Sequence, residues 1–370
     1  MAKFVFWLSV SFVAFSYLGY PALLAVWSWL RPRPVRKSPF IPFVSIVLCV
    51  RNGADHLKRK LTNLLTEVNY PPDKYEVILV SDGSTDGTIE AARQFADARL
   101  RVFTLPVSSG KPTALNFAVN EARGEIVIFN DLRQTMDPNA VRELVANFSD
   151  PAVGAVTGEM VLADNEDRFR PQYGIYYRYE QWIRLKESAV YSMIGSSGAF
   201  SAIRRDLFRP LPAEVILDDV YTPMQIVMQG YRTVYDSSAL AYDPHDGRSE
   251  FRRKLRTLTG NYQILRLMPE ILTPRNPLLA LYLFHKVFRL IVPFFLIAAL
   301  GANLFLRSGF YAFSLAAQTL FYFTALVSSR LRKLPAIGMV AASGSTFVQA
   351  NCAAVLGLFF FLRGKRDLWV

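Results

Sequence analysis

Residues 77–88 read VILVSDGSTDGT, and this stretch decides the fold. Its four leading apolar residues show no polar alternation, as expected of a strand that is covered on both faces of a parallel sheet. Small residues and two carboxylates, Asp82 and Asp86, follow directly. Ligands of open α/β sheets bind beyond the carboxyl ends of the strands, so the stretch predicts a ligand-facing loop. The alternative is a plain turn in which Asp86 caps a helix over 88–95.

Strands and helices alternate on both sides of this stretch. Further strands are expected over 44–50, 101–105, 124–131 and 154–161, with an amphipathic helix over 55–67. This alternation predicts an α/β fold with a doubly wound, mostly parallel sheet and helices on both faces. Neither the glycine fingerprint of dinucleotide sites nor a Walker phosphate loop is present, which argues against a dinucleotide cofactor.

Polar pairs follow three of the predicted strands. Arg51 and Asn52 follow the first strand, Ser81 and Asp82 the second, and the strand over 124–131 ends in Asn130 and Asp131. Carboxyl ends of neighbouring parallel strands open onto one rim of a sheet. The three pairs therefore predict a single site, which includes Asn52.

Both ends of the chain are apolar enough for a membrane protein. Hydrophobic residues make up 52% of the sequence. Windows long enough to span a bilayer lie within 4–30, 290–306, 310–327 and 336–362. The first is too long for a signal peptide and lacks a small-residue cleavage site, so we expect it to remain as an anchor. Transmembrane helices are thus predicted at both ends of an α/β domain.

Basic residues set the expected orientation. The cluster RPRPVRK at 31–37 follows the first span, and such clusters stay on the cytoplasmic side. We therefore expect a multi-pass protein of the inner cell membrane with a cytoplasmic soluble domain. The expected division is a transmembrane helix over 1–30, a basic linker over 31–42, the catalytic domain over 43–250, amphipathic interfacial helices over 251–289 and a transmembrane region over 290–370.

The net charge of +12 does not indicate nucleic acid as a partner. Many basic residues flank membrane segments, at 31–37, 330–333 and 363–366, which favours contact with membrane lipids. No nucleic-acid-binding motif is present. The only cysteines, Cys49 and Cys352, suit a reducing compartment without disulfides.

A set of motifs carries a family resemblance. In chain order they are VSIVLCVRN, YEVILVSDGSTDGT, GKPTALNFAV, IVIFND, GSSGAFSAIRR, ILDDV and RRKLR. Together they resemble a family 2 glycosyltransferase of the GT-A fold, over about 44–260. The flanking helices are similar to those of the membrane-embedded branch that includes cellulose, hyaluronan and poly-N-acetylglucosamine synthases. This resemblance implies an inverting transfer from a nucleoside-diphosphate sugar, expected to be a UDP-sugar, to a hydroxyl of a lipid or polysaccharide.

The resemblance also implies nucleotide-binding residues. Asp82 matches the strand-end carboxylate of the family, although Ser81 replaces the carboxylate that usually precedes it. Lys111 and Asn116 match the GK-x-x-ALN loop, so both are expected near the nucleotide. The alternative for Lys111 is a solvated loop charge.

The family's metal-binding DxD motif falls on Asp131, Leu132 and Arg133. Arg133 stands where the second carboxylate belongs. Either Asp131 alone anchors Mg²⁺ or Mn²⁺, which we favour, or Arg133 neutralises the leaving diphosphate directly. Both residues are expected to contact the nucleotide.

Catalytic and acceptor residues follow from the later motifs. Asp219, next to Asp218, matches the catalytic base, and the alternative is a helix N-terminus that favours acids. Gly198 would let the backbone approach a bound sugar. Arg253 and Arg256 lie where processive relatives carry QxxRW. An interfacial basic helix is the alternative for these two arginines.

Two departures from the family leave other functions open. Arg133 replaces the second carboxylate of DxD, and Thr257 replaces the tryptophan of QxxRW, which predicts short products. These departures motivate a second hypothesis, a catalytically silent sugar-nucleotide-binding subunit of an envelope polysaccharide assembly complex. A transporter is disfavoured because so few spans leave little room for a substrate pathway. The Tyr-rich region 169–192 is either helix packing or an acceptor platform.

Overall fold

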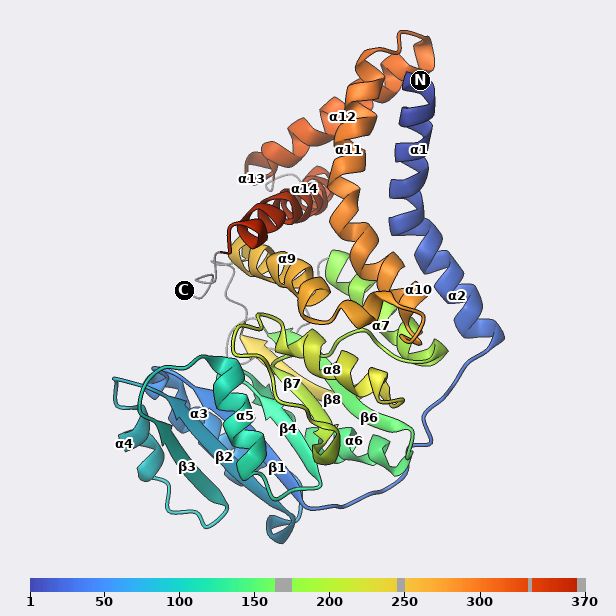
Figure 1. The fold of residues 1–370 in the computed structure, drawn as a ribbon. Helices are drawn as coiled ribbons and strands as arrows, with labels where there is room; N and C mark the ends of the chain where they lie inside the picture. The colour runs from blue at the N-terminus through green and yellow to red at the C-terminus, as the bar shows by residue number, and fades with distance from the viewer. Residues whose placement is uncertain (164–174, 245–249, 332–334, 365–370) are drawn as a thin grey trace.

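The computed structural model of this chain describes residues 1–163, 175–244, 250–331 and 335–364. A sheet flanked by helices forms one end of the molecule, and long helices extend from it toward the N-terminus (Figure 1). Parts of three expected regions, at 169–174, 332–333 and 365–370, lie outside the described residues.

The sheet has eight strands in the order β3-β2-β1-β4-β7-β6-β8-β5. Their bounds are β1 (Val44–Val50), β2 (Tyr75–Asp82), β3 (Leu100–Leu105), β4 (Ile126–Asn130), β5 (Thr135–Met136), β6 (Val153–Ala163), β7 (Phe200–Arg204) and β8 (Arg232–Pro244). β1 pairs in parallel with β2 and β4, and β2 with β3, so the predicted parallel arrangement is confirmed for this half. β7 is antiparallel to both β4 and β6, which makes the whole sheet mixed.

Helices cover both faces of the sheet. They are α3 (Ala54–Thr62), continued by the π-helical turn η2 (Asn63–Glu67), α4 (Thr88–Arg93), α5 (Lys111–Glu121), α6 (Ala140–Ala146), α7 (Ile175–Val190) and α8 (Asp218–Met228), with the 3-10 turns η3 (Pro72–Lys74), η4 (Asn147–Ser149) and η5 (Arg205–Leu207). The helix α9 (Glu250–Leu267) and the 3-10 turn η7 (Pro269–Leu272) follow the last strand and lead to the apolar helices. In β2, Val77 and Leu79 join the hydrophobic cluster that contains α3 and α6 residues. Ile78 and Val80 join the opposite cluster, with residues of α5 and α8. The unbroken apolar run is therefore explained by burial on both faces.

Three of the described helices are long and apolar enough to cross a membrane: Ala2–Leu30, Leu279–Leu304 and Val340–Leu362. The first consists of α1 (Ala2–Ala14), η1 (Phe15–Gly19) and α2 (Tyr20–Leu30), and the second of α10 (Leu279–Tyr282), η8 (Leu283–Val287) and α11 (Phe288–Leu304). The third belongs to α14 (Pro335–Leu362), which follows α12 (Gly309–Leu326) and α13 (Ser328–Leu331). The predicted span over 310–327 forms α12, which is not among the three.

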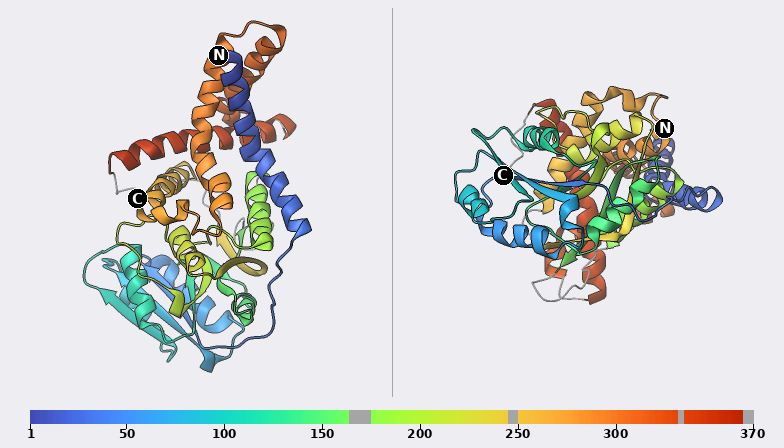
Figure 2. Two further views of the ribbon diagram at one scale, coloured as in Figure 1. Left: turned by 45° about the vertical axis from the view of Figure 1, so that its right-hand side comes forward. Right: turned by 90° about the horizontal axis from the view of Figure 1, so that it is seen from below.

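The last helix runs in a different direction from the others. α1 and α11 lie side by side, whereas α14 is one continuous helix that runs across them (Figure 2). It packs closely on α9, because a Cβ added at Gly357 would lie 3.0 Å from the backbone nitrogen of Thr259. The apolar helices are thereby connected to the helix that follows the sheet.

Candidate active site

The loops behind β1 and β2 are joined by hydrogen bonds. Asn52, with φ of 50°, accepts a hydrogen bond at Oδ1 from the backbone N–H of Thr85 at 2.9 Å. Asp86 accepts bonds from the backbone N–H groups of Thr88 and Ala54, at 3.0 and 3.1 Å. The capping role considered for Asp86 is thus present, and Asn52 lies at the predicted rim.

Asp82 lies at the end of β2 and holds the loop that precedes α5. Its buried carboxylate accepts hydrogen bonds from the N–H groups of Ser109 at 2.7 Å and Gly110 at 3.0 Å, and from the hydroxyl of Ser108 at 3.1 Å. Gly110 has φ of +89°, a conformation that suits glycine. Asp82 therefore positions Lys111, the first residue of α5.

Lys111 is the centre of a charge cluster. Its Nζ lies 3.0 Å from Asp131 Oδ1 and 3.6 Å from Asp218 Oδ2, and it donates to the carbonyl of Gly198 at 3.4 Å. Burial lowers the pKa of Lys111, but Asp218 and Asp131 raise it by more, so the net shift is upward. The side chain is therefore a protonated site residue, and the alternative of a solvated loop charge is wrong.

Asp218 and Asp219 begin α8, so they are also the acids that favour a helix N-terminus. Burial, and then the charge of Asp218, raises the pKa of Asp219 to about 6. Its buried Oδ1 has no hydrogen-bond partner among the described residues. A buried carboxylate with an unused oxygen and a raised pKa is suited to accept a proton at neutral pH.

The loop 195–198 packs directly against Asp219. Ser196 donates from its backbone N–H to the carbonyl of Asp219 at 2.7 Å. A Cβ added at Gly198 would lie 3.3 Å from the Cβ of Asp219. The close backbone approach expected at Gly198 is thus made to Asp219.

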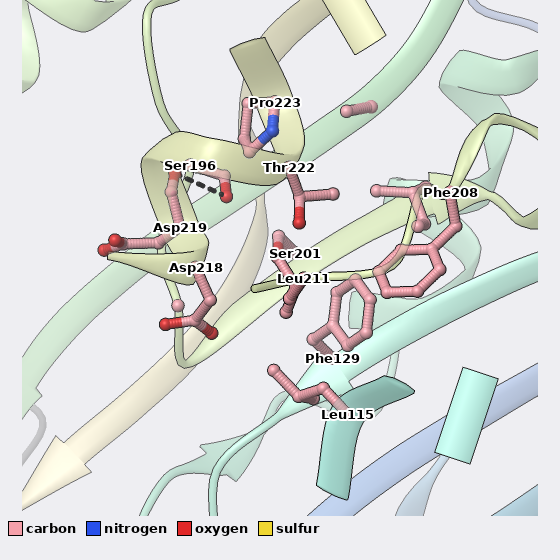
Figure 3. A pocket seen from close by; sticks show the side chains of 13 residues that line it. Leu115, Phe129, Ser196, Ser201, Phe208, Leu211, Asp218, Asp219, Thr222 and Pro223 are labelled. Atoms are coloured by element: carbon pink, nitrogen blue, oxygen red, sulfur yellow. Dashed lines mark hydrogen bonds between the residues drawn. The ribbon is translucent and has the colours of Figure 1, made fainter. Parts of the chain in front are cut away.

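A small, largely apolar cavity of about 20 Å³ lies on one side of the two aspartates. Figure 3 shows both carboxylates directed away from the rings of Phe129 and Phe208. Oδ2 of Asp218 lies 3.6 Å from Nζ of Lys111, on the side opposite the apolar lining, and the apolar side chains pack against α8.

A second, polar chamber of about 80 Å³ also borders Asp219, on the side of the apolar helices. Its lining comes from α7, α8, α9 and η8 and the loop 193–196, and its polar side chains include Arg184, Glu187, Thr257, Asn261, His285 and Lys286. Asn261 is buried, and its Oδ1 has no partner among the described residues. The sequence did not point to Arg184, Asn261 or Lys286 as site residues. In the sequence each is simply a polar residue within an amphipathic or apolar helix, and that pattern alone does not indicate a site.

Buried hydrogen bonds support this chamber from the N-terminal helix. Glu187 Oε1 accepts from the hydroxyl of Tyr20 at 2.6 Å and lies 2.6 Å from Nδ1 of His285. His285 Nε2 lies 3.3 Å from Glu180, which also pairs with Arg289. The helices α2, α7 and η8 are thereby held together next to Asp219.

The remaining predicted residues lie outside the charge cluster. The side-chain amide of Asn116 donates to the carbonyl of Leu211 at 2.8 Å and accepts from the backbone N–H of Leu211 at 2.7 Å. Arg133 and Arg253 are exposed. Arg256 donates to the carbonyl of Ile216 at 3.3 Å, two residues before Asp218. Asn116 and Arg256 therefore brace loops beside the site, and their predicted ligand contacts stay predictions.

The carboxylates offer limited ligands for a divalent metal ion. Among the described residues, no group of three or more His, Cys, Asp or Glu side chains could hold a metal ion. The side chain of Asp131 is 40% exposed and presents oxygen ligands of the kind that Mg²⁺ and Mn²⁺ prefer. An ion here fits if Asp131 binds it and phosphate and water oxygens complete its coordination.

Comparisons with known proteins agree with this geometry. Residues 45–211 match the family described as Glycosyl transferase family 2. Over 93 residues the chain is 39% identical to Glycosyltransferase AglE of Haloferax volcanii, covering 25% of this chain and 30% of that protein. Over 268 residues it is 24% identical to poly-beta-1,6-N-acetyl-D-glucosamine synthase of Staphylococcus aureus, covering 70% of this chain and 64% of that protein. The chain thus spans less than two thirds of either relative.

A solved structure shares the fold over nearly the whole chain. It is the mannosyltransferase PcManGT from Pyrobaculum calidifontis in complex with GDP-Man and Mn²⁺. The TM-score is 0.78 at 22% sequence identity, and the match covers 99% of this chain and 100% of that chain. The predicted resemblance is confirmed: residues 45–211 form a family 2 glycosyltransferase domain, and the chain carries apolar helices that suit a membrane.

Proposed function

We propose that this chain is a membrane-bound, inverting hexosyltransferase that moves a sugar from a nucleoside-diphosphate sugar to a hydroxyl of a lipid or polysaccharide acceptor. The observation that carries the proposal is the position of Asp219. Its unpartnered carboxylate oxygen, seen among the described residues, lies between the cluster around Lys111 and the polar chamber beside the apolar helices. That position suits a base between a donor and an acceptor.

Asp219 would act as the general base. The acceptor hydroxyl gives its proton to Oδ1 of Asp219 as its oxygen bonds to the anomeric carbon, and the bond from that carbon to the diphosphate breaks. Because burial and Asp218 raise the pKa of Asp219 to about 6, its carboxylate is ionised at neutral pH yet basic enough to take the proton.

Lys111 would stabilise the leaving diphosphate. It is protonated, stands at the N-terminus of α5, and already contacts Asp131. A divalent ion bound by Asp131 would neutralise charge on the phosphates. Asp82 would set the loop that carries Lys111, and Asn52 and Arg133 lie at the same rim for the nucleotide.

The polar chamber would receive the acceptor. Among the described residues, Oδ1 of Asp219 and Oδ1 of Asn261 lack a hydrogen-bond donor, and the side chains of Arg184 and Lys286 have neither a hydrogen bond nor an ion pair within 4.0 Å. Sugar hydroxyls both donate and accept, so they complement such a lining. The apolar helices beside the chamber support delivery from a membrane, with the catalytic domain, which we place at 43–250, on the cytoplasmic side of the inner membrane.

The test is transfer from labelled UDP- and GDP-sugars by the purified full chain in nanodiscs of the lipids with which it co-purifies. We expect a labelled lipid or glycan product with the wild type and about a hundredfold less, or lower still, with Asp219→Asn, while both proteins bind the donor. Donor binding by the wild type without any product would instead favour the silent subunit. Absence of donor binding across the panel would contradict both functions.

A further inference from the structure

A hollow of about 410 Å³ lies away from the sugar site, where the N-terminal helix meets the rest of the chain. It is formed by the end of α2, the start of the basic linker, the end of α7 and the segment that begins α10. Its lining residues are Trp27, Arg31, Arg33, Val190, Tyr191, Pro277, Leu278, Ala280 and Leu281. The proposed transfer reaction gives this hollow no role.

One side of the hollow is positively charged. Neither Arg31 nor Arg33 has a carboxylate within 4.0 Å among the described residues. The guanidinium of Arg33 lies 5.1 Å from the ring centre of Tyr191, and its backbone is fixed by bonds of 2.7 Å to Ala189 and to Arg232. The structure thus fixes the backbone of Arg33 at the hollow and leaves the charge of its guanidinium group without a carboxylate partner among the described residues. An anion could pair with this charge.

The other side of the hollow is apolar and continuous with a surface that suits a membrane. Leu278 and Leu281 contribute buried side chains, and the exposed side chain of Trp27 lines the hollow from α2. Trp29 and Leu30, in the last turn of the same helix, are exposed. Exposed tryptophans at the end of an apolar helix are typical of the boundary between lipid and water.

We propose that this hollow binds one anionic phospholipid, whose phosphate-bearing headgroup lies between Arg31 and Arg33 and whose upper acyl chain lies along Leu278 and Leu281. Cations next to an apolar wall at the level of the headgroups match a charged lipid better than a neutral lipid or a free anion. A lipid here would join α2, α7 and α10. Since α7 also carries Arg184 and Glu187, a lipid that fixes the end of α7 would help to hold these two lining residues of the polar chamber in place.

The test uses the full-length protein in a neutral detergent and counts bound lipid by native mass spectrometry. The probes are dioctanoyl phosphatidylglycerol and dioctanoyl phosphatidylcholine at equal concentrations. We expect binding of the first with at least about fivefold preference. Arg31→Gln and Arg33→Gln should each weaken it about fivefold, since a basic residue contributes about 1 kcal/mol near an anionic surface. Arg36→Gln, in the same basic cluster but outside the hollow, is the matched control and should have no effect.

Two further measurements keep the proposal falsifiable. Ala280→Glu adds a carboxylate to an exposed lining position and should abolish the preference, while thermal stabilisation by UDP or GDP stays as in the wild type. Glycerol 3-phosphate should not compete with the lipid, because it lacks the acyl chain. Equal losses from all three arginine variants, equal binding of both lipids, or full competition by glycerol 3-phosphate would overturn the proposal.

Discussion

The ammonium group of Lys111 lies 3.0 Å from Oδ1 of Asp131, which joins the start of α5 to the end of β4. Asp82 holds the loop before Lys111, and Asp218 approaches the same ammonium at 3.6 Å. Three motifs that are far apart in the sequence therefore meet at one cation. Lys111 thus lies between Asp131, in the proposed nucleotide site, and Asp218, the neighbour of the proposed base.

Lys111→Met should weaken binding of the donor nucleotide about tenfold to a hundredfold. The variant removes a charge-assisted contact to the diphosphate, and such contacts contribute about 1.5–3 kcal/mol. Isothermal titration with UDP and GDP measures the change. Lys58→Met, at an exposed position of α3, is the control and should bind normally. An unchanged affinity of the Lys111 variant would remove Lys111 from the nucleotide site.

Asp219→Asn should lower the transfer rate about 10²- to 10⁴-fold, the usual contribution of a positioned general base. Donor affinity should stay near that of the wild type because other residues hold the nucleotide. Initial rates with saturating donor provide the measurement. Asp206→Asn removes an exposed carboxylate of η5 and serves as the control. A rate within about threefold of wild type would reject Asp219 as the base.

The pH dependence of transfer should report the same carboxylate. Asp219 has a pKa of about 6 and acts in its ionised form, so kcat/KM should be half-maximal near pH 6. Below that pH it should fall about tenfold per unit as the base becomes protonated, and above it should reach a plateau. Rates between about pH 4.5 and 8 provide the profile. A flat profile from about pH 5 to 7.5 would contradict the assignment.

Removal of divalent ions should stop transfer. Asp131 offers a single carboxylate, and the phosphates of the donor complete the coordination of an ion. Activity should therefore disappear in excess EDTA and return with Mn²⁺, while Arg133→Asp, which restores a second carboxylate, should need less of the ion. Full wild-type activity in EDTA would contradict this expectation. Lys111 and Arg133 would then be the groups that stabilise the leaving diphosphate.

Products made by this chain alone should be short. Thr257 borders the chamber of about 80 Å³, where it offers no aromatic surface on which a growing chain could stack. Mass spectrometry of the products should therefore find acceptors extended by one or a few sugars. Thr257→Trp should lengthen them if stacking is what is missing. A long homopolymer made by the wild type would refute the expectation.

Local patterns were enough to predict β1, β2, β3, β4 and β6 and the apolar helices. The run 77–80 has no alternating polar residues. Such a run indicates a strand that is buried on both faces, and this can be read without knowing which elements pack on it. The helix Ala2–Leu30 followed from length and hydrophobicity in the same way. The strands β5, β7 and β8 escaped prediction. The antiparallel direction of β7 is also beyond local patterns, because pairing direction depends on the route of the chain and not on periodicity.

The motifs determined the family, but only the tertiary structure decided what each side chain contacts. Asn116 matches a family position, yet its amide is used by the backbone of Leu211, 95 residues away. The polar chamber unites Arg184, Asn261 and Lys286 from three helices, and no local pattern relates them. Periodicity reports how a segment is buried, whereas contacts between distant segments follow from how helices and sheet pack. That packing decided which charges meet at Lys111 and which oxygen of Asp219 has no hydrogen-bond partner among the described residues.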